Sequence, residues 1–251
     1  MDSNTDEKLI IYGRNPVKEY LLSEKSAEVF YTSLDDDNSL TGYYISLAKS
    51  KGATVKKVKK EKLNFICGSE HHQGVAVLAS SQDYCDLDDI FDLAQQKNEA
   101  PFIIIADGIE DPHNLGAIIR TSECAGVHGL IIPERRGCLV NSTVYKASAG
   151  ACSHILIHKA KNIANTINEL KNRGVFCYCT DADGDMFYET NLTGACAIVV
   201  GSEGRGVSEL VRKRCDGTLS IPLKGSVNSL NAAVAAGIVI YEVIRQNMYK
   251  R

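Results

Sequence analysis

The sequence lacks a long apolar run and a secretory leader pattern. No apolar stretch in the 251 residues approaches the roughly 18 to 20 residues that a membrane-spanning helix needs. The first ten residues, MDSNTDEKLI, do not show the basic and then apolar order of a secretory signal. We therefore expect a cytoplasmic protein with no membrane partner.

A cysteine arrangement that could hold a metal is also missing. The nine cysteines include no CxxC pair and no Cys/His cluster with the spacing of a zinc site. Their odd number and irregular spacing do not indicate a disulfide framework. Cys177 and Cys179 are two residues apart, which on a strand would place both on one face. We interpret the cysteines as reduced, mostly buried thiols and expect no metal.

The chain has no excess of positive charge, since its formal net charge is −3. This balance argues against a protein that coats nucleic acid without specificity. The charges are unevenly distributed, however, because one short stretch is rich in lysine and another is rich in aspartate. The lysines are Lys49, Lys51, Lys56, Lys57, Lys59, Lys60 and Lys62, and the aspartates are Asp83, Asp86, Asp88, Asp89 and Asp92. The lysine stretch is compatible with a solvated surface and with a patch that contacts phosphates.

Residues 8–80 alternate short apolar runs with helical patterns. The segments LIIY, EVFYTS, TVKKV and GVAVLAS are typical of strands, and helices are predicted up to about Leu22 and over LTGYYISLAKSKG. This pattern predicts a small α/β domain. Residues 81–100 are acidic, polar and weakly helical, and we interpret them as a linker.

Residues 101–251 are predicted to form a second α/β domain. Six segments are typical of strands: FIIIAD, GLIIP, HILIH, VFCYCT, CAIVVG and TLSIP. Helical patterns such as NIANTINELKNRG lie between them. Alternation of this kind predicts a parallel sheet with helices on both faces, and ligands bind such sheets outside the carboxyl ends of the strands.

Three polar loops follow strands of this predicted sheet. The loop after FIIIAD contains Asn114 and Arg120, the loop after CAIVVG is GSEGRGVS, and the loop after TLSIP contains Ser229 and Asn231. Each loop alone has a local explanation as a helix cap, a tight turn or a surface cation. Because all three follow strands of one sheet, we expect them to converge on one crevice. The glycine order GxxGxG after a late strand differs from the dinucleotide fingerprint, which leaves a nicotinamide oxidoreductase as a distant alternative.

The same three loops carry a resemblance to a known family. DPHNLGAIIRTSECAGVHGLIIP, IVVGSEGRGVS and IPLKGSVNSLNAAVAAGIVIYE resemble, in this order, the three motifs of the SpoU/TrmH-type RNA 2′-O-ribose methyltransferases of the SPOUT superfamily. IYGRNPVKEYL and HHQGVAVLAS resemble the substrate-binding domain of those enzymes. The likeness is nearest to the 23S rRNA guanosine 2′-O-methyltransferase branch. It implies a C-terminal parallel-sheet α/β domain with a trefoil knot, a small N-terminal L30e-like α/β substrate-binding domain, S-adenosyl-L-methionine as the cofactor and a homodimer.

The resemblance also implies roles for particular residues. It assigns catalysis to Asn114, Arg120, Glu203, Ser229 and Asn231, cofactor contacts to Gly201, Gly204, Ile221, Asn228 and Leu230, and RNA contacts to Arg14, Lys56, Lys57, Lys59 and Lys60. A guanidinium stays protonated in proteins. We therefore expect Arg120 to stabilise the developing alkoxide and to hold phosphate rather than to act as a general base.

Two other functions stay open. A transfer-RNA 2′-O-methyltransferase is the nearest alternative, and a noncatalytic RNA-binding factor with the same fold is the main one from another class. The presence of Asn114, Arg120, Glu203 and Asn231 argues against the noncatalytic factor. The enzyme assignment predicts that Asn114, Glu203 and Asn231 meet around one cleft.

Overall fold

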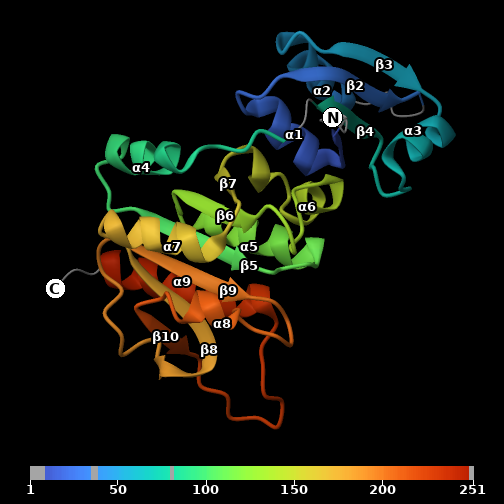
Figure 1. Cartoon of the computed structure of the whole chain (residues 1–251). Helices are drawn as coiled ribbons and strands as arrows, with labels where there is room; N and C mark the ends of the chain where they lie inside the picture. Colours follow the sequence, from blue (N-terminus) through green and yellow to red (C-terminus); the bar gives the residue numbers. More distant parts are fainter. Residues whose placement is uncertain (1–8, 35–38, 80–81, 249–251) are drawn as a thin grey trace, which may run out of the picture. The chain divides into compact units, whose positions relative to one another are not determined.

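The computed structural model describes residues 9–34, 39–79 and 82–248. The chain forms two compact units, and each is built from two segments of sequence. The first unit comprises Met1–Asp83 and Val140–His154, and the second comprises Tyr84–Leu139 and Ile155–Arg251. Figure 1 labels most elements of both units. None of the described helices combines the length and apolar character needed to cross a membrane.

The first unit contains a four-stranded sheet with the order β1-β4-β2-β3. Its strands are β1 (Leu9–Tyr12), β2 (Ala27–Ser33), β3 (Thr54–Val58) and β4 (Val75–Ala79). Strand β4 runs antiparallel to β1 and β2, whereas β2 and β3 are parallel. All five residues of the apolar strand β4 are buried, whereas no residue of β3 is buried. The lysine-rich strand β3 therefore forms an exposed edge of the sheet.

Helices from two parts of the chain complete the first unit. They are α1 (Arg14–Leu22), α2 (Ser39–Ser50), α3 (Lys60–Cys67) and α6 (Ser142–Ala147), with the 3-10 helix η1 (Ala151–Ser153). Helix α3 ends at Gly68, whose φ of 58° is in the left-handed region that glycine adopts at low cost. Tyr145 of α6 is fully buried and packs edge-to-face on Tyr20 of α1, with 6.2 Å between ring centroids. The segment Val140–His154 is thus part of this core.

The second unit contains a six-stranded sheet with the order β10-β8-β9-β5-β6-β7. The strands are β5 (Phe102–Asp107), β6 (Gly129–Pro133), β7 (Leu156–Ala160), β8 (Phe176–Met186), β9 (Cys196–Gly201) and β10 (Gly217–Ser220). Each described pair of neighbouring strands is parallel. All six predicted strands and the predicted parallel sheet are confirmed.

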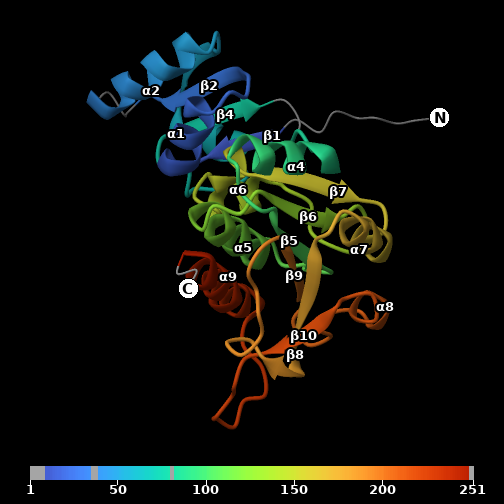
Figure 2. The ribbon, with the colours of Figure 1, turned by 90° about the vertical axis from the view of Figure 1, so that its left-hand side faces the viewer.

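Helices cover both faces of the parallel sheet. They are α4 (Leu87–Gln96), α5 (Pro112–Cys124), α7 (Ile163–Asn172), α8 (Glu209–Arg212) and α9 (Ala232–Met248). Figure 2 shows α5 and α9 on one face and α7 and α8 on the other. The alanine-rich start of α9 has little side-chain bulk, which favours a close helix approach. A Cβ built on Gly237 of α9 would lie 3.7 Å from the side chain of Thr121 on α5, so these helices do pack closely.

The predicted domain boundaries need correction at residues 81–100 and 140–154. Residues from Tyr84 onward belong to the second unit, and Leu87–Gln96 forms helix α4 rather than a linker. Two of the aspartates that suggested a linker cap this helix, since the Asp86 N–H donates to Asp89 Oδ2 at 2.8 Å. Ile90 points the other way and is fully buried in the core. The expected boundaries at residues 8, 80, 81 and 251 lie outside the described residues.

Candidate active site

Asp111 and not Asn114 caps helix α5. The Asp111 carboxylate accepts the backbone N–H groups of His113 and Asn114 at 3.1 and 3.3 Å. Pro112 occupies the first turn, where its missing N–H costs nothing. Because Asp111 satisfies the helix terminus, the Asn114 side chain is available for contacts outside its own helix.

The side chains of Asn114, Glu203 and Asn231 form a closed hydrogen-bonded triangle. Asn114 Nδ2 donates to Glu203 Oε1 at 2.9 Å. Asn231 Nδ2 donates to Glu203 Oε1 at 2.6 Å and to Asn114 Oδ1 at 2.8 Å. Asn114 lies in the first turn of α5, which follows β5, and the other two residues lie in the segments after β9 and β10. The structure therefore brings together the three segments that the sequence predicted to meet.

Asn231 links this triangle to the last helix. Its Oδ1 accepts the backbone N–H groups of Ala233 and Val234 at 3.0 and 3.2 Å, which caps the start of α9. Its Nδ2 is meanwhile fully engaged by Asn114 and Glu203. One amide thus fixes the helix terminus and the triangle together, and a serine in its place could not do both.

The loop after β9 takes a shape that requires glycine at its first position. A Cβ on Gly201 would lie 2.0 Å from the carbonyl carbon of Gly206 and 2.2 Å from the nitrogen of Val207. The turn is closed by reciprocal backbone hydrogen bonds between Ser202 and Gly206 at 3.2 and 2.9 Å. Gly206 has a φ of 66°, again in the left-handed region. Glycine at these two positions therefore lets the chain fold back tightly on itself.

A cavity of about 670 Å³ lies against these loops. Eight of the predicted cofactor and catalytic residues line it, namely Gly201, Glu203, Gly204, Ile221, Asn228, Ser229, Leu230 and Asn231. Asn114 does not line the cavity itself but is hydrogen bonded to two residues that do. The cavity size is within the range of about 300 to 1,000 Å³ that is usual for small-molecule sites.

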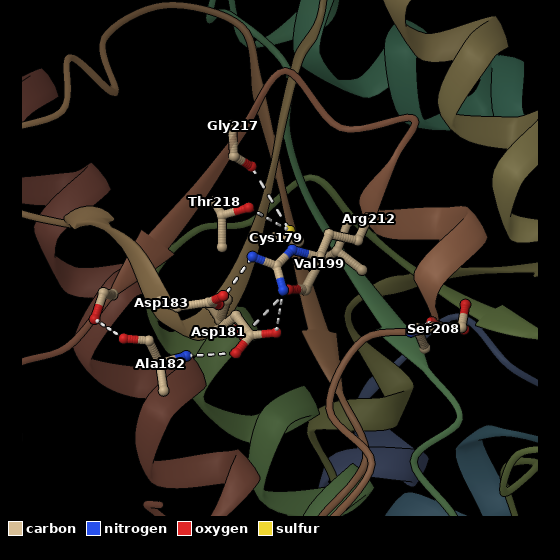
Figure 3. Close-up of polar contacts among 12 residues, drawn as sticks. Cys179, Asp181, Ala182, Asp183, Val199, Ser208, Arg212, Gly217 and Thr218 are labelled. Atoms are coloured by element: carbon tan, nitrogen blue, oxygen red, sulfur yellow. Dashed lines mark hydrogen bonds and ion pairs between the residues drawn. The ribbon is translucent and has the colours of Figure 1, made fainter.

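Strand β8 supplies a wall of this cavity that the sequence reasoning missed. Thr180, Asp181 and Ala182 line it. Arg212 of α8 fixes this end of β8, because its guanidinium bonds Asp181 at 3.2 Å and Asp183 at 2.8 Å (Figure 3). The hydrogen bond from Arg212 also lowers the pKa of the Asp183 carboxyl below its ordinary value. The segment VFCYCT has the pattern of a strand of the sheet, so the same rule about carboxyl ends could have found Asp181.

Arg120 belongs neither to the Asn114–Glu203–Asn231 triangle nor to the cavity lining. It is exposed on α5, it does not line the cavity, and its side chain has no hydrogen bond or ion pair with another described residue. Helix geometry places it about 9 Å along the axis from Asn114 and about 120° around it. Within one chain, the structure does not bring Arg120 to the site.

The predicted RNA-contacting residues lie in the first unit. Lys56 and Lys57 are exposed on the edge strand β3, and Lys59 and Lys60 are exposed at the start of α3. Arg14 is half-buried at the start of α1, and its backbone N–H donates to Gln73 Oε1 at 2.8 Å. Four of the five predicted residues therefore form one basic edge. Over the described ranges, no cluster of three or more histidine, cysteine, aspartate or glutamate side chains could hold a metal ion.

Comparison with known families gives two matches, one on each side of residues 86–100, and the C-terminal match includes the segment Val140–His154 that packs in the first unit. Residues 101–241 match the SpoU rRNA Methylase family, and residues 10–85 match the substrate-binding domain of RNA 2′-O ribose methyltransferases. The chain belongs to the SpoU methyltransferase family. The predicted family, the α/β fold class and the assignment to RNA methyltransferases are thereby confirmed.

Individual relatives of this SpoU family member agree over nearly the whole chain. The TrmH family tRNA/rRNA methyltransferase YacO from Bacillus subtilis (strain 168) is 40% identical over 238 residues, which cover 94% of this chain and 95% of YacO. The crystal structure of AviRb from Streptomyces viridochromogenes, a SpoU methyltransferase in complex with AdoMet, superposes with a TM-score of 0.84 at 23% identity, covering 97% of this chain and 92% of AviRb.

A second solved structure gives the same fold. The AdoMet-bound rRNA methyltransferase from Sinorhizobium meliloti has a TM-score of 0.80 at 22% identity, covering 95% of this chain and 87% of that chain. At such identities the solved structures establish the fold. The trefoil knot, the homodimer and the RNA target remain predictions.

Proposed function

We propose that this protein transfers a methyl group from S-adenosylmethionine to a ribose 2′-hydroxyl of RNA. The observation that carries the proposal is the Asn114–Glu203–Asn231 triangle at the edge of the cavity. The substrate that the sequence resemblance favours is a guanosine of 23S rRNA. A transfer RNA is the second candidate, because the relative YacO is named for both RNA classes.

The cavity fits the chemistry of S-adenosylmethionine. Ile221, Leu223 and Leu230 supply apolar surface for an adenine ring, and the loop from Gly201 to Gly206 supplies backbone groups. The carboxylates of Asp181 and Glu203 complement the positive charges of the methionine part, and Arg205 complements its carboxylate. When bound, the cofactor supplies a methyl group that its sulfonium charge already activates.

The protein then has two tasks, which are alignment and removal of one proton. Both amides donate to Glu203 Oε1, so this carboxylate is held in one orientation before substrate arrives. Such preorganisation is the main way in which a protein accelerates a group transfer that needs little acid–base chemistry. We propose that the triangle orients the ribose, and that the proton leaves through a phosphate oxygen or water.

The proposed role of Arg120 requires a second chain. Arg120 is exposed and remote from the cavity of its own chain, yet α9 presents a stripe of exposed apolar residues at helical spacing: Val234, Ile238, Tyr241 and Met248. We propose a homodimer in which Arg120 stabilises the developing alkoxide in the site of the other subunit. Chains carrying Arg120→Ala and chains carrying Asn231→Asp should each have strongly reduced activity alone near neutral pH, and their mixture should recover part of the activity. A mixture no more active than the mean of its two components would refute sharing of the site.

A chemical test of Arg120 uses the lysine variant. Arg120→Lys keeps the charge but loses the planar fork of donors, so turnover should fall while cofactor affinity stays normal. Turnover equal to wild type would remove Arg120 from the catalytic residues.

The function itself is tested with labelled methyl donor and unmodified RNA. The protein is incubated with ribosomal RNA or with transfer RNA, and the modified position is mapped by resistance of the 2′-O-methylated site to alkaline cleavage. Methylation of one RNA class identifies the substrate. Cofactor binding by calorimetry without methylation of either class would favour the noncatalytic RNA-binding factor, and binding of NAD instead would favour an oxidoreductase.

A further inference from the structure

Helix α3 of the first unit presents a phenylalanine to solvent. Phe65 is 80% exposed, more than any other large apolar side chain among the residues that the structure describes. Two positions earlier, Leu63 is fully buried and anchors the helix in a small core with Tyr12 and Ala76. Positions two apart lie on nearly opposite sides of a helix, so Phe65 points outward. The packing of the first unit therefore does not explain this aromatic ring.

The surroundings of Phe65 are strongly basic. Glu61 is the only acidic residue between Thr54 and Cys67, whereas this segment contains five lysines. Lys62 lies one helical turn before Phe65, and its Nζ is 5.1 Å from the ring centroid. No ion pair with another described residue involves Lys56, Lys59, Lys60 or Lys62. An apolar ring is thus set among cations that lack carboxylate partners in the described chain.

Protection of a sheet edge explains only part of this arrangement. Strand β3 is an edge strand, and lysines on such strands prevent pairing with other chains. That explanation suffices for Lys56 and Lys57. It does not extend to Phe65 and Lys62, which lie on the helix that follows and not on the strand. An exposed phenylalanine would by itself favour association with other chains, so it needs another reason.

An aromatic ring among lysines is suited to an unpaired nucleotide. Single-stranded RNA exposes the faces of its bases, which stack on aromatic side chains, while lysines hold the adjacent phosphates. In a continuous duplex the base faces are covered by their neighbours, so only the phosphates remain accessible. A purely apolar partner would gain nothing from the surrounding cations.

We propose that Phe65 stacks on an unpaired base of the substrate RNA while Lys62 and the lysines at the start of α3 hold the flanking phosphates. The first unit then selects a single-stranded or looped segment over a continuous duplex. This inference rests on the proposed function and adds the structural class of its substrate.

Fluorescence offers a direct test, because the sequence contains no tryptophan. Phe65→Trp places the sole indole at the proposed stacking position in the full-length protein. A short single-stranded oligoribonucleotide should quench its emission in a saturable way, and the duplex of that strand with its complement should quench it much less. Phe176→Trp, at a phenylalanine that is 58% exposed in the second unit, is the matched control and should respond weakly to both. Equal quenching by duplex and single strand, or equal responses of the two variants, would overturn the proposal.

Two further variants separate ring stacking from general apolar contact. Phe65→Tyr keeps the ring and should bind the oligoribonucleotide like wild type, whereas Phe65→Leu keeps only apolar character and should bind at least about fivefold more weakly. Full affinity of Phe65→Leu would overturn the proposal and would point to a protein partner for this face. Wild-type methyl transfer is measured in parallel. If wild type methylates RNA while Phe65→Leu binds the oligoribonucleotide with wild-type affinity, the stacking inference fails and the proposed function stands. If wild type methylates no RNA, the proposed function itself fails.

Discussion

The cavity edge of the second unit and the basic edge of the first unit hold their polar groups in opposite ways. Around the cavity, both oxygen and nitrogen atoms of the Asn114 and Asn231 amides are engaged within the protein. On the basic edge, Lys56, Lys59 and Lys60 have no ion-pair partner in the described part of the chain. The first arrangement fixes geometry before a ligand arrives, whereas the second leaves charge available to a ligand.

This difference matches two kinds of recognition. Prepositioned hydrogen-bond groups discriminate one small ligand and one reacting geometry, because they need not reorganise. Unpaired cations attract a polyanion over a distance and tolerate variation in its sequence. Substitutions around the cavity should therefore have large effects that depend on atomic detail, and substitutions on the basic edge should have smaller effects that depend on salt.

The largest effect is expected for Gly201→Ala. The added methyl group would overlap the backbone of Gly206 and Val207, and backbone atoms cannot move aside as a flexible side chain can. The loop should open, and affinity for S-adenosylmethionine measured by calorimetry should fall by more than about 100-fold. Gly225→Ala is the control in the neighbouring cavity loop, since a Cβ there would meet nothing within 4 Å. If Gly201→Ala and Gly225→Ala bind S-adenosylmethionine with equal affinity, the tight turn at Gly201 is not required for cofactor binding.

The second largest effect is expected for Asn231→Asp, which adds a negative charge to the triangle. In Asn231→Asp, a carboxylate oxygen replaces an amide nitrogen that lies 2.6 Å from Glu203 Oε1. Two carboxylates at that distance cannot both ionise, so the pKa of one must rise. We expect kcat/KM to fall about 100-fold near neutral pH and to recover partly as the pH falls and a proton is taken up.

The control for this prediction is Asn231→Ala. It loses the same hydrogen bonds without adding charge, so its activity relative to wild type should not improve at lower pH. Parallel pH profiles of the two variants would show that repulsion at Glu203 is not the cause.

Much of this site could be predicted because two simple rules apply to it. Apolar runs such as FIIIAD and CAIVVG have the pattern of buried parallel strands, and parallel strands end at one edge. Those rules suffice to place Asn114, Glu203 and Asn231 together. Asp181 directly follows the predicted strand VFCYCT but is easily overlooked, because no distinctive motif surrounds it.

Other features depend on tertiary packing that local patterns do not specify. The segment of helix α4 resembles a linker because its aspartates dominate the composition, although Leu87, Ile90 and Ala94 recur at helical spacing and are buried. No local sequence pattern indicates that Val140–His154 packs in the first unit, because its buried Tyr145 contacts Tyr20, which is distant in the sequence. The position of Arg120 relative to the cavity likewise required coordinates.

On the basic edge we expect a moderate effect that depends on salt. Replacing Lys56, Lys57, Lys59 and Lys60 with alanine should weaken RNA binding and flatten the slope of log affinity against log salt. The slope should change by about 0.7 for each phosphate of single-stranded RNA that the variant no longer neutralises. A matched pair of single variants is Lys60→Ala and Lys213→Ala. Lys213 is already paired with Glu209 at 2.6 Å, so its replacement should change RNA binding less than that of Lys60. An unchanged slope in the fourfold variant would indicate that these lysines form only a solvated surface and do not contact phosphates.

The smallest effect concerns one buried histidine in each unit. His72 Nδ1 accepts the Gly74 N–H at 3.0 Å in the first unit, and His128 Nδ1 accepts the Phe102 N–H at 3.0 Å in the second. Burial is the main cause that lowers the pKa of both imidazoles. A nitrogen that accepts a backbone N–H must also lose that bond when it is protonated. Both histidines are therefore neutral in the folded protein near neutral pH.

The sign of the pH dependence follows from these lowered values. A folded-state pKa below the unfolded one means that the unfolded chain binds protons first, so the free energy of unfolding should fall as the pH drops below about 6.5. Both histidines also have a nearby lysine that lowers the pKa and a glutamate that raises it, but only His128 is hydrogen bonded to its glutamate, Glu99, at 3.1 Å. Glu99→Gln should therefore make the second unit more sensitive to acid and leave the first unit unchanged. Urea unfolding between about pH 7.5 and pH 5.5, with amide exchange to report on each unit, measures this; equal acid sensitivity of wild type and Glu99→Gln would contradict it.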